Sequence, residues 1–214
     1  FKDKKFNMIA NIDKTIIICF FSFFLFSCAT KSIPLTVNSG SVKPGSQITK
    51  QGKTLPLLGT PVQIGQQIPE TSLVDAQTMQ PVNLQDFQGS VLFISIIPSI
   101  DTKGVRVTHY LGEEGDSLSP AIKRITISRD TPFAQKRFAE ETDLDDSQYL
   151  SDYKAGDFGK SVGLLIDGPM LLARSVILVD KLGVVQYLQV VPAITNLPDM
   201  EKAFNAATKL ANKP

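Results

Sequence analysis

The stretch Val91-Leu92-Phe93-Ile94-Ser95-Ile96-Ile97 is an almost continuous run of apolar, largely β-branched residues that ends at Pro98. Such a run predicts a central strand covered on both faces, because a strand with one wet face alternates apolar and polar residues. Proline cannot donate a ladder hydrogen bond, so the strand is expected to end there. The sequence therefore predicts a sheet whose most buried strand leads into a loop that starts at Pro98.

The segment that follows predicts a strand and then a helix. Ile125-Thr126-Ile127-Ser128 is a second short apolar run. Asp130-Thr131-Pro132 then supplies a cap residue and a proline for the first helical position, which favours a helix over residues 133–141. These segments give the strand and helix alternation of an α/β fold.

The last third of the chain predicts a hairpin and a closing helix. Asp180-Lys181-Leu182-Gly183 separates apolar strands at 175–179 and 184–190, as in an antiparallel hairpin with glycine in the turn. A helix over 198–211 follows, and its apolar stripe consists of Met200, Phe204, Ala207 and Leu210 or Ala211.

An amino-terminal hairpin is expected from residues 55–58 and 62–64, which flank Gly59-Thr60-Pro61. Together these elements predict an α/β sandwich of thioredoxin type, with a central mixed sheet flanked by helices and an amino-terminal β-hairpin.

The amino end has the layout of a secretory signal. Residues 15–26 (TIIICFFSFFLF) are nearly all apolar, follow Lys14 and precede small residues. Twelve helical residues rise only about 18 Å, which is too short for a hydrocarbon core of roughly 30 Å. Leu25-Phe26-Ser27-Cys28 resembles the bacterial lipobox, whose cysteine is lipidated on sulfur and becomes the first mature residue. The alternative is an uncleaved anchor or a short buried helix.

The signal interpretation divides the chain into three parts. Residues 1–27 are a lipoprotein signal peptide that Met8 would open, residues 28–50 are a Ser/Thr/Gly/Pro-rich flexible tether, and residues 51–214 are the globular domain. We expect the domain to lie outside the cytoplasm, at the bacterial cell envelope, held on a membrane by lipid on Cys28. Cys19 leaves with the signal, so the mature protein has no free thiol.

The composition excludes some classes of function. A net charge of +1, from 22 basic and 21 acidic residues, gives no basic field for a nucleic acid. Two cysteines and one histidine, at 19, 28 and 109, cannot form a structural zinc site. No cofactor or metal is expected: His109 is read as solvated, as are the acidic residues Glu113, Glu114 and Asp116 in a glycine-bearing loop.

Several motifs resemble the thiol peroxidase branch of the peroxiredoxins. Its active-site loop begins PSIDT, which stands here as Pro98-Ser99-Ile100-Asp101-Thr102. Matching segments follow in the family's order: TSLVD at 71–75, TPFAQKRF at 131–138, Phe158-Gly159, and LARSVILVD at 172–180. The resemblance covers residues 50–212 and implies the peroxiredoxin form of the thioredoxin fold.

Both redox cysteines of that family are replaced. Where the resemblance implies the peroxidatic cysteine the chain has Arg106, after one extra residue in Thr102-Lys103-Gly104-Val105, and where it implies the resolving cysteine the chain has Ala139. Peroxide reduction needs a low-pKa thiolate that accepts oxygen and is recycled. We therefore expect a degenerate member without peroxidase activity. The helix after the lost cysteine is expected to be short or broken, since residues 109–120 contain two glycines and a proline.

The resemblance also implies roles for the residues that remain. Pro98 matches the proline that shields the site, Thr102 the threonine that hydrogen-bonds peroxide, and Arg174 the arginine that lowers the thiol pKa. A purely structural alternative is that packing holds Arg174 and that Thr102 caps the next segment. If Arg106 approaches Arg174, an anion should relieve the repulsion: either an internal carboxylate (Asp101, Glu113 or Glu114) or an external anionic ligand.

Three functions remain open at this point. The first is a non-catalytic thiol-peroxidase-like lipoprotein that acts as a binding or interaction module at the envelope. The second is a thioredoxin-dependent thiol peroxidase that reduces peroxides in envelope antioxidant defence. The third is a structural homodimer, since peroxiredoxins of this branch commonly pair through the loops around the active site.

Overall fold

The structure is a computed structural model that describes residues 36–100, 118–142 and 147–213. The chain divides into two compact units, Phe1–Pro34 and Leu35–Pro214, and all described residues belong to the second. The predicted signal peptide and Cys28 therefore lie outside the described residues. Among the described residues, no helix has the length and apolar character needed to cross a membrane.

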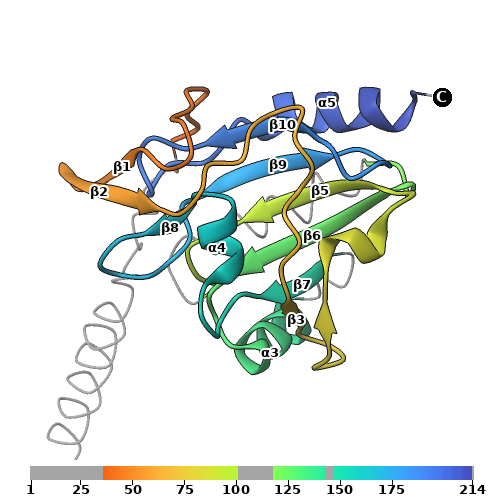
Figure 1. The fold of residues 1–214 in the computed structure, drawn as a ribbon, viewed down its shortest axis with the longest axis horizontal. Helices are drawn as coiled ribbons and strands as arrows, with labels where there is room; N and C mark the ends of the chain where they lie inside the picture. The colour runs from red at the N-terminus through yellow and green to blue at the C-terminus, as the bar shows by residue number, and fades with distance from the viewer. Residues whose placement is uncertain (1–35, 101–117, 143–146, 214) are drawn as a thin grey trace, which may run out of the picture. The chain divides into compact units, whose positions relative to one another are not determined.

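A seven-stranded mixed sheet forms the centre of the described fold (Figure 1). Its strands, in spatial order, are β10 (Val185–Val190), β9 (Ser175–Val179), β5 (Val91–Ile96), β6 (Ile122–Ser128), β7 (Gln148–Ser151), β3 (Leu73–Asp75) and β4 (Pro81–Val82). Every residue of β5 is buried. Ile94 pairs with Ile125 of parallel β6 and with Ile177 of antiparallel β9. The mixed sheet and the buried central strand are thus confirmed.

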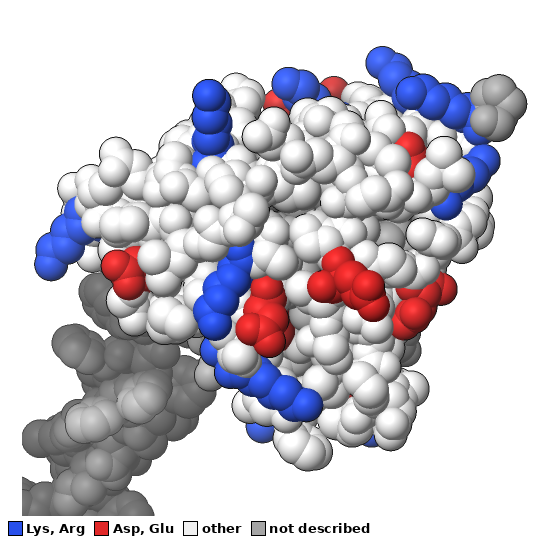
Figure 2. Space-filling model, viewed as in Figure 1, with Lys and Arg blue, Asp and Glu red and all other residues white. Residues whose placement is uncertain are grey.

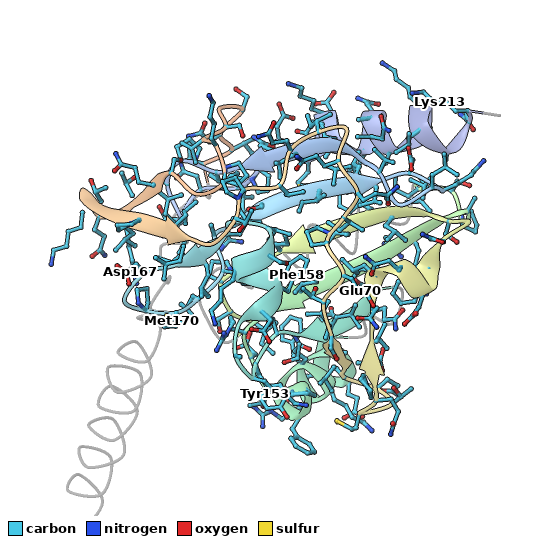
Figure 3. All side chains as sticks on the ribbon, viewed as in Figure 1. Glu70, Tyr153, Phe158, Asp167, Met170 and Lys213 are labelled. Atoms are coloured by element: carbon cyan, nitrogen blue, oxygen red, sulfur yellow. The ribbon has the colours of Figure 1, made fainter. Side chains whose placement is uncertain are left out.

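Helices cover both faces of this sheet. The helix α5 (Met200–Ala211) packs on one face, where the rings of Phe93 and Phe204 stack with centroids 5.0 Å apart. The helix α3 (Pro132–Thr142) packs against β7. The short helix α4 (Asp157–Ser161) covers the opposite face, and Phe158 points from it into the core (Figure 3). The predicted helices at 133–141 and 198–211 and the hairpin β9–β10 are confirmed.

The amino-terminal hairpin exists, but its bounds differ from the prediction. It consists of β1 (Gln47–Lys50) and β2 (Lys53–Leu58), joined through Gln51 and Gly52, and β2 also pairs with β8 (Leu165–Ile166). Residues 62–64 form no strand. The reason is local: Gly59 has φ +108°, and an added Cβ would lie 1.9 Å from the carbonyl oxygen of Lys160. The chain therefore bends away after β2 instead of returning along it.

The prediction of a flexible tether over 28–50 needs correction for residues 36–50. Thr49 lies in β1, and its N–H donates to the carbonyl of Pro192 at 2.8 Å. Val42 donates to Val190 at 3.0 Å, and Asn38 donates to Leu197 at 2.8 Å. Composition predicted disorder because the segment lacks an apolar period, yet its backbone groups find partners far along the chain. Residues 28–35 lie outside the described part.

Several short elements were not predicted from the sequence. These are β3, β4, β7, β8, α4 and the short 3₁₀ helix η1 (Leu84–Phe87). The segment expected to hold a broken helix, 109–120, falls mostly within 101–117, outside the described residues.

Candidate functional site

Three neighbouring strands bring the candidate site residues to one end of the sheet. Ile96 pairs with Ile127 on one side and with Ser175 on the other. The residues just beyond these pairs are Pro98 after β5, Asp130 after β6 and Arg174 before β9. Pro98 and Arg174, which the family resemblance singled out, therefore lie at the same end of adjacent strands.

The Asp130 carboxylate holds the start of the loop after β5. Its Oδ1 accepts a hydrogen bond from the Ser99 hydroxyl at 2.8 Å. Its Oδ2 accepts from the Ile100 N–H at 2.9 Å and from the Ser128 hydroxyl at 2.7 Å. Three donors converge on one side chain, so Asp130 fixes the direction in which the chain leaves Pro98.

The sequence places a cap residue within Asp130-Thr131-Pro132, and in the structure Thr131, directly before Pro132, performs that role. The Thr131 hydroxyl accepts from the Ala134 N–H at 3.3 Å. Behind it, buried Gln135 donates through Nε2 to Ser128 Oγ at 2.9 Å and to the Leu150 carbonyl at 3.1 Å. Gln135 was missed as a site residue. The only signal for Asp130 and Gln135 was their polarity next to two apolar strands.

Ala139 lies in the apolar cluster under the same loop. Ile97, Ile100, Phe138 and Tyr149 form this cluster with Ala76, and Ala139 packs against it half-buried. The rings of Phe138 and Tyr149 meet edge to face, with centroids 6.0 Å apart. The position where the resemblance implies a resolving cysteine therefore carries a methyl group in an apolar contact, and the loop residues beside Pro98 share that contact.

Arg174 is a buried cation with few partners. It is 5% exposed, and its Nε donates to the Ile194 carbonyl at 3.2 Å. Its Nη1 makes no hydrogen bond within the described residues. Burial lowers the pKa of Arg174 to about 10, and no carboxylate among the described residues offsets that cost. A guanidinium keeps its charge under these conditions, so the site presents an uncompensated positive charge with a free donor.

A second buried charge lies at the end of β7, which β5 and β6 separate from β9 in the sheet. Asp152 follows β7 and is 4% exposed. Burial raises the pKa of Asp152, although the N–H groups of Gly159 and Phe158, at 3.0 and 3.2 Å, and the charge of Arg129 act in the opposite direction. The carboxylate holds the start of α4, which is a structural role.

The other predicted site residues lie outside the described part of the chain. Thr102 and Arg106 fall in 101–117, as do Asp101, His109, Glu113 and Glu114. The pairing of Arg106 with Arg174 stays a prediction. Within 36–100, 118–142 and 147–213, no group of His, Cys, Asp or Glu side chains could hold a metal ion.

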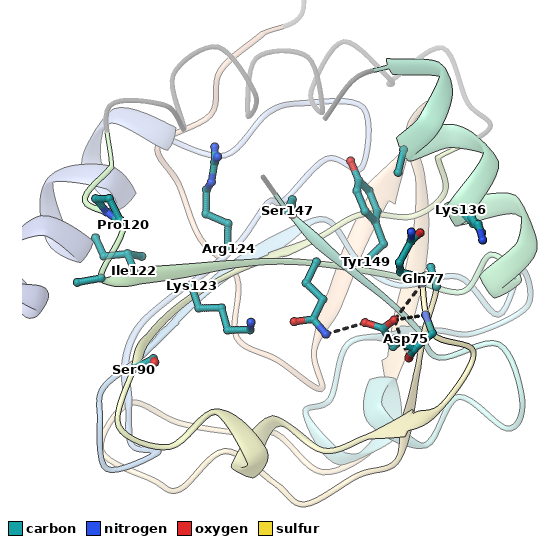
Figure 4. Close-up of a pocket in the computed structure, with 15 residues that line it drawn as sticks. Asp75, Gln77, Ser90, Pro120, Ile122, Lys123, Arg124, Lys136, Ser147 and Tyr149 are labelled. Carbon is teal, nitrogen blue, oxygen red and sulfur yellow. Dashed lines mark hydrogen bonds between the residues drawn. The ribbon is translucent and has the colours of Figure 1, made fainter. Parts of the chain in front are cut away.

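A groove of about 790 Å³ lies at the opposite ends of β5 and β6 (Figure 4). Two of its charged side chains have partners: Lys123 Nζ lies 4.5 Å from the centre of the Phe87 ring, and Asp75 accepts from the Gln148 amide at 2.6 Å. Burial alone would raise the pKa of Asp75, but hydrogen bonds from Thr78, Gln148 and Gln77 outweigh it and lower the pKa. This groove therefore offers no reactive cluster.

On the face shown in Figure 2, positive and negative side chains both occur, separated by uncharged surface. This face offers no continuous basic track of the kind that a nucleic-acid backbone requires.

The comparison with known families decides the identity of the fold. The model of the Redoxin family matches residues 63–204. The chain belongs to the Redoxin family. The match contains both the loop start at Pro98 and Arg174.

Redoxin relatives of this chain are named thiol peroxidase. The thiol peroxidase of Halalkalibacterium halodurans is 39% identical over 164 residues, which cover 76% of this chain and 97% of the relative. That of Bacillus subtilis is 38% identical over 167 residues, covering 77% and 98%.

Solved structures agree on the Redoxin fold. A peroxiredoxin-like protein from Aquifex aeolicus has a TM-score of 0.69 at 28% identity, covering 77% of this chain and 96% of that one. A thiol peroxidase from Chromobacterium violaceum also has a TM-score of 0.69, at 24% identity and the same coverage, which speaks for the fold alone. The expected peroxiredoxin form of the thioredoxin fold is confirmed.

Proposed function

We propose that this Redoxin chain is a membrane-anchored binding protein without peroxidase activity, and that it binds a small anion through Arg174 at the cell envelope. The observation that carries the proposal is the Arg174 guanidinium: buried, charged and with Nη1 unpartnered within the described residues. A carboxylate or another small oxyanion would complete its hydrogen bonds and neutralise its charge.

The absence of cysteine from the matched region supports the loss of catalysis. The sequence has cysteines only at 19 and 28, ahead of the Redoxin match at 63–204. Arg106 and Ala139 stand where the resemblance implies the peroxidatic and resolving cysteines. Arginine and alanine cannot accept an oxygen atom from peroxide and be re-reduced by a thiol.

A peroxide-consumption assay separates this proposal from its competitor, a thioredoxin-dependent thiol peroxidase of the envelope. We expect the full chain, supplied with thioredoxin, thioredoxin reductase and NADPH, to consume hydrogen peroxide no faster than buffer does. Turnover above background in protein freed of contaminating peroxidases would establish the competing function and contradict ours.

The binding half of the proposal is tested by thermal shift with acetate and with phosphate. Saturating anion should raise the melting temperature by about 5–10 °C, since a ligand at a hundred times its dissociation constant adds about 2.7 kcal/mol. Arg174→Met should abolish the shift while keeping the fold, because a buried methionine replaces an uncompensated charge.

The matched control for this test is Arg137→Met. Arg137 also lies near the described site, on α3, but its side chain is 68% exposed and pairs with Glu141 at 3.9 Å. This variant should bind both anions as the unmodified chain does. The absence of a saturable shift in the unmodified chain, or an equal loss in both variants, would contradict an anion site at Arg174.

The membrane anchor is the third part of the proposal, and it rests on Leu25-Phe26-Ser27-Cys28 after a short apolar stretch. Metabolic labelling with palmitate should mark the unmodified chain and leave Cys28→Ala unlabelled and released from membranes. Equal labelling of the two chains would remove the anchor from the proposal.

A further inference from the structure

The segment that follows β10 is held from the inside by Arg174. The Val191 N–H donates to the Arg174 carbonyl at 3.0 Å, and the Arg174 Nε donates to the Ile194 carbonyl at 3.2 Å. The second contact is the only hydrogen bond that the guanidinium makes within the described residues. The direction of the guanidinium therefore depends on where residue 194 lies.

The same segment is held from the outside at its middle by Thr49 of β1, whose carbonyl accepts from the Ile194 N–H at 3.0 Å, and at its two ends by residues 36–42, which we call the strap. Strap and segment exchange backbone hydrogen bonds at one end: Asn38 donates to Leu197 at 2.8 Å, and Leu197 donates to Thr36 at 2.9 Å. At the other end Val42 donates to Val190 at 3.0 Å, and Val190 donates to the Ser41 hydroxyl, also at 3.0 Å.

Gln189 locks the middle of the strap. It is 3% exposed, and its Nε2 donates to the carbonyl of Asn38 at 2.8 Å and to that of Gly40 at 3.1 Å. Its Oε1 accepts from the Asp199 N–H, at the start of α5, at 3.0 Å. A buried amide with all these groups paired fixes the strap in one register, because any shift would leave it unsatisfied.

Polar contacts, rather than burial, dominate the docking of the strap. Val37 is 57% exposed, and only Val42 of the strap packs partly against the core. Net stabilisation by such hydrogen bonds is about 1 kcal/mol each, so the strap can open locally while the sheet stays folded. The Redoxin match begins at residue 63, so the strap is an addition to the matched domain.

We propose that the strap is a positioning element for Arg174, and that its undocking weakens anion binding at that residue. The path runs from the strap to residues 190–197, and from the Ile194 carbonyl to the guanidinium. The second half of this statement rests on the function proposed above, whereas the first half concerns only the position of Arg174.

The test compares two proline variants of the full chain. In the double variant Asn38→Pro/Val42→Pro the strap loses its two N–H donors to Leu197 and Val190. Ser39→Pro is the matched control, because the exposed Ser39 N–H donates no hydrogen bond within the described residues. Exchange of the Arg174 Nε–H with solvent is followed by arginine-selective ¹⁵N NMR, with the backbone N–H of Ile94 in β5 as the internal reference for global opening.

We expect the Arg174 Nε–H to exchange at least tenfold faster in the double variant, with Ile94 unchanged and the control like the unmodified chain. The acetate concentration at half-saturation should rise at least fivefold in parallel. Unchanged protection of the Arg174 Nε–H in the double variant overturns the strap proposal. Faster exchange in a chain that binds no acetate in any form supports the strap as a positioning element and overturns the anion site instead.

Discussion

The Asp130 side chain fixes the start of the loop that follows β5. Its carboxylate accepts hydrogen bonds from Ser99, Ile100 and Ser128, which belong to two neighbouring strand ends. An amide in its place keeps one acceptor oxygen but turns the other into a donor, so at least one of the three donors loses its partner.

We therefore expect Asp130→Asn to lower the free energy of unfolding by about 1–3 kcal/mol. Urea denaturation measures the change, with Asp167→Asn as the control. Asp167 is exposed on the turn after β8, so its substitution should stay within about 0.5 kcal/mol of the unmodified chain (Figure 3). Equal effects of the two variants would show that the Asp130 contacts contribute no stability.

Asp152 and Asp75 should respond to acid in opposite ways. Burial raises the folded-state pKa of Asp152, so protonation favours the folded state as the pH falls through that raised pKa toward the ordinary value of about 4. The pKa of Asp75 is lowered, so its contribution is present above about pH 4 and is lost as the pH falls through its folded-state pKa. Unfolding free energies of Asp152→Asn and Asp75→Asn between pH 3 and 7, each subtracted from the unmodified chain, should slope in opposite directions. Slopes of the same sign would contradict at least one of the two assignments.

The sequence identified those site residues that belong to a family motif. It did not identify residues whose role depends on contacts formed only in the folded chain. Pro98 and Arg174 were identified from motifs, and the register around Ile96 brings them to one sheet end. The role of Asp130 was not predicted, because its three donors come together only once β5 and β6 are paired. The surroundings of Arg174 were not predictable from its own segment, because its hydrogen-bond partner, the Ile194 carbonyl, lies beyond the β9–β10 hairpin.

At the scale of elements, the contact between β2 and α4 depends on a missing side chain. A Cβ on Gly59 would lie 1.9 Å from the Lys160 carbonyl oxygen, and Gly59 has φ +108°. Gly52, in the β1–β2 turn, also has a positive φ, +79°, but has nothing within 4 Å. Comparing the same substitution at the two glycines therefore distinguishes the effect of a steric clash from the effect of a positive φ.

Gly59→Ala should lower the free energy of unfolding by more than about 3 kcal/mol, since backbone must move to admit the methyl group. Gly52→Ala should cost only about 1 kcal/mol, which is the penalty for an L residue at positive φ. Thermal or urea unfolding of both variants gives the comparison. A Gly59 variant as stable as the Gly52 variant would mean that β2 and α4 separate at no cost.

The elements that the sequence predicted are those long enough to show a period. The strands β5 and β9, the hairpin β9–β10 and the helices α3 and α5 extend over five residues or more. By contrast, β8 has two residues and β7 is Gln148-Tyr149-Leu150-Ser151, in which polar and apolar side chains give no distinct pattern. Such short strands form where a neighbouring strand offers unpaired backbone groups. The identity of that neighbour cannot be predicted from the short segment itself.

For the whole molecule, the expected homodimer has one structural correlate. Phe133, in the first turn of α3 and next to the loop after β6, is 74% exposed. Tyr153, which projects from the domain in Figure 3, is 37% exposed. Exposed aromatic side chains of this kind are enriched in contacts between proteins.

If the chain pairs through this region, Phe133→Ser should weaken self-association at least tenfold in sedimentation velocity over a concentration series. Leu182→Ser is the control, because Leu182 is equally large and 73% exposed but lies on the β9–β10 turn. Loss of association in the Leu182 variant, or in neither, would place the contact elsewhere or remove it.

The docked strap also determines how far the domain can travel. With lipid on Cys28 and a free chain up to residue 50, a fully extended leash would reach about 75 Å from the bilayer. Because the docked strap starts at Thr36, only the residues from 28 to 36 would separate the lipid from the domain. Their fully extended length is about 28 Å. The hemisphere that the domain can explore shrinks about twentyfold, so an anchored chain would meet only what lies at the membrane surface itself.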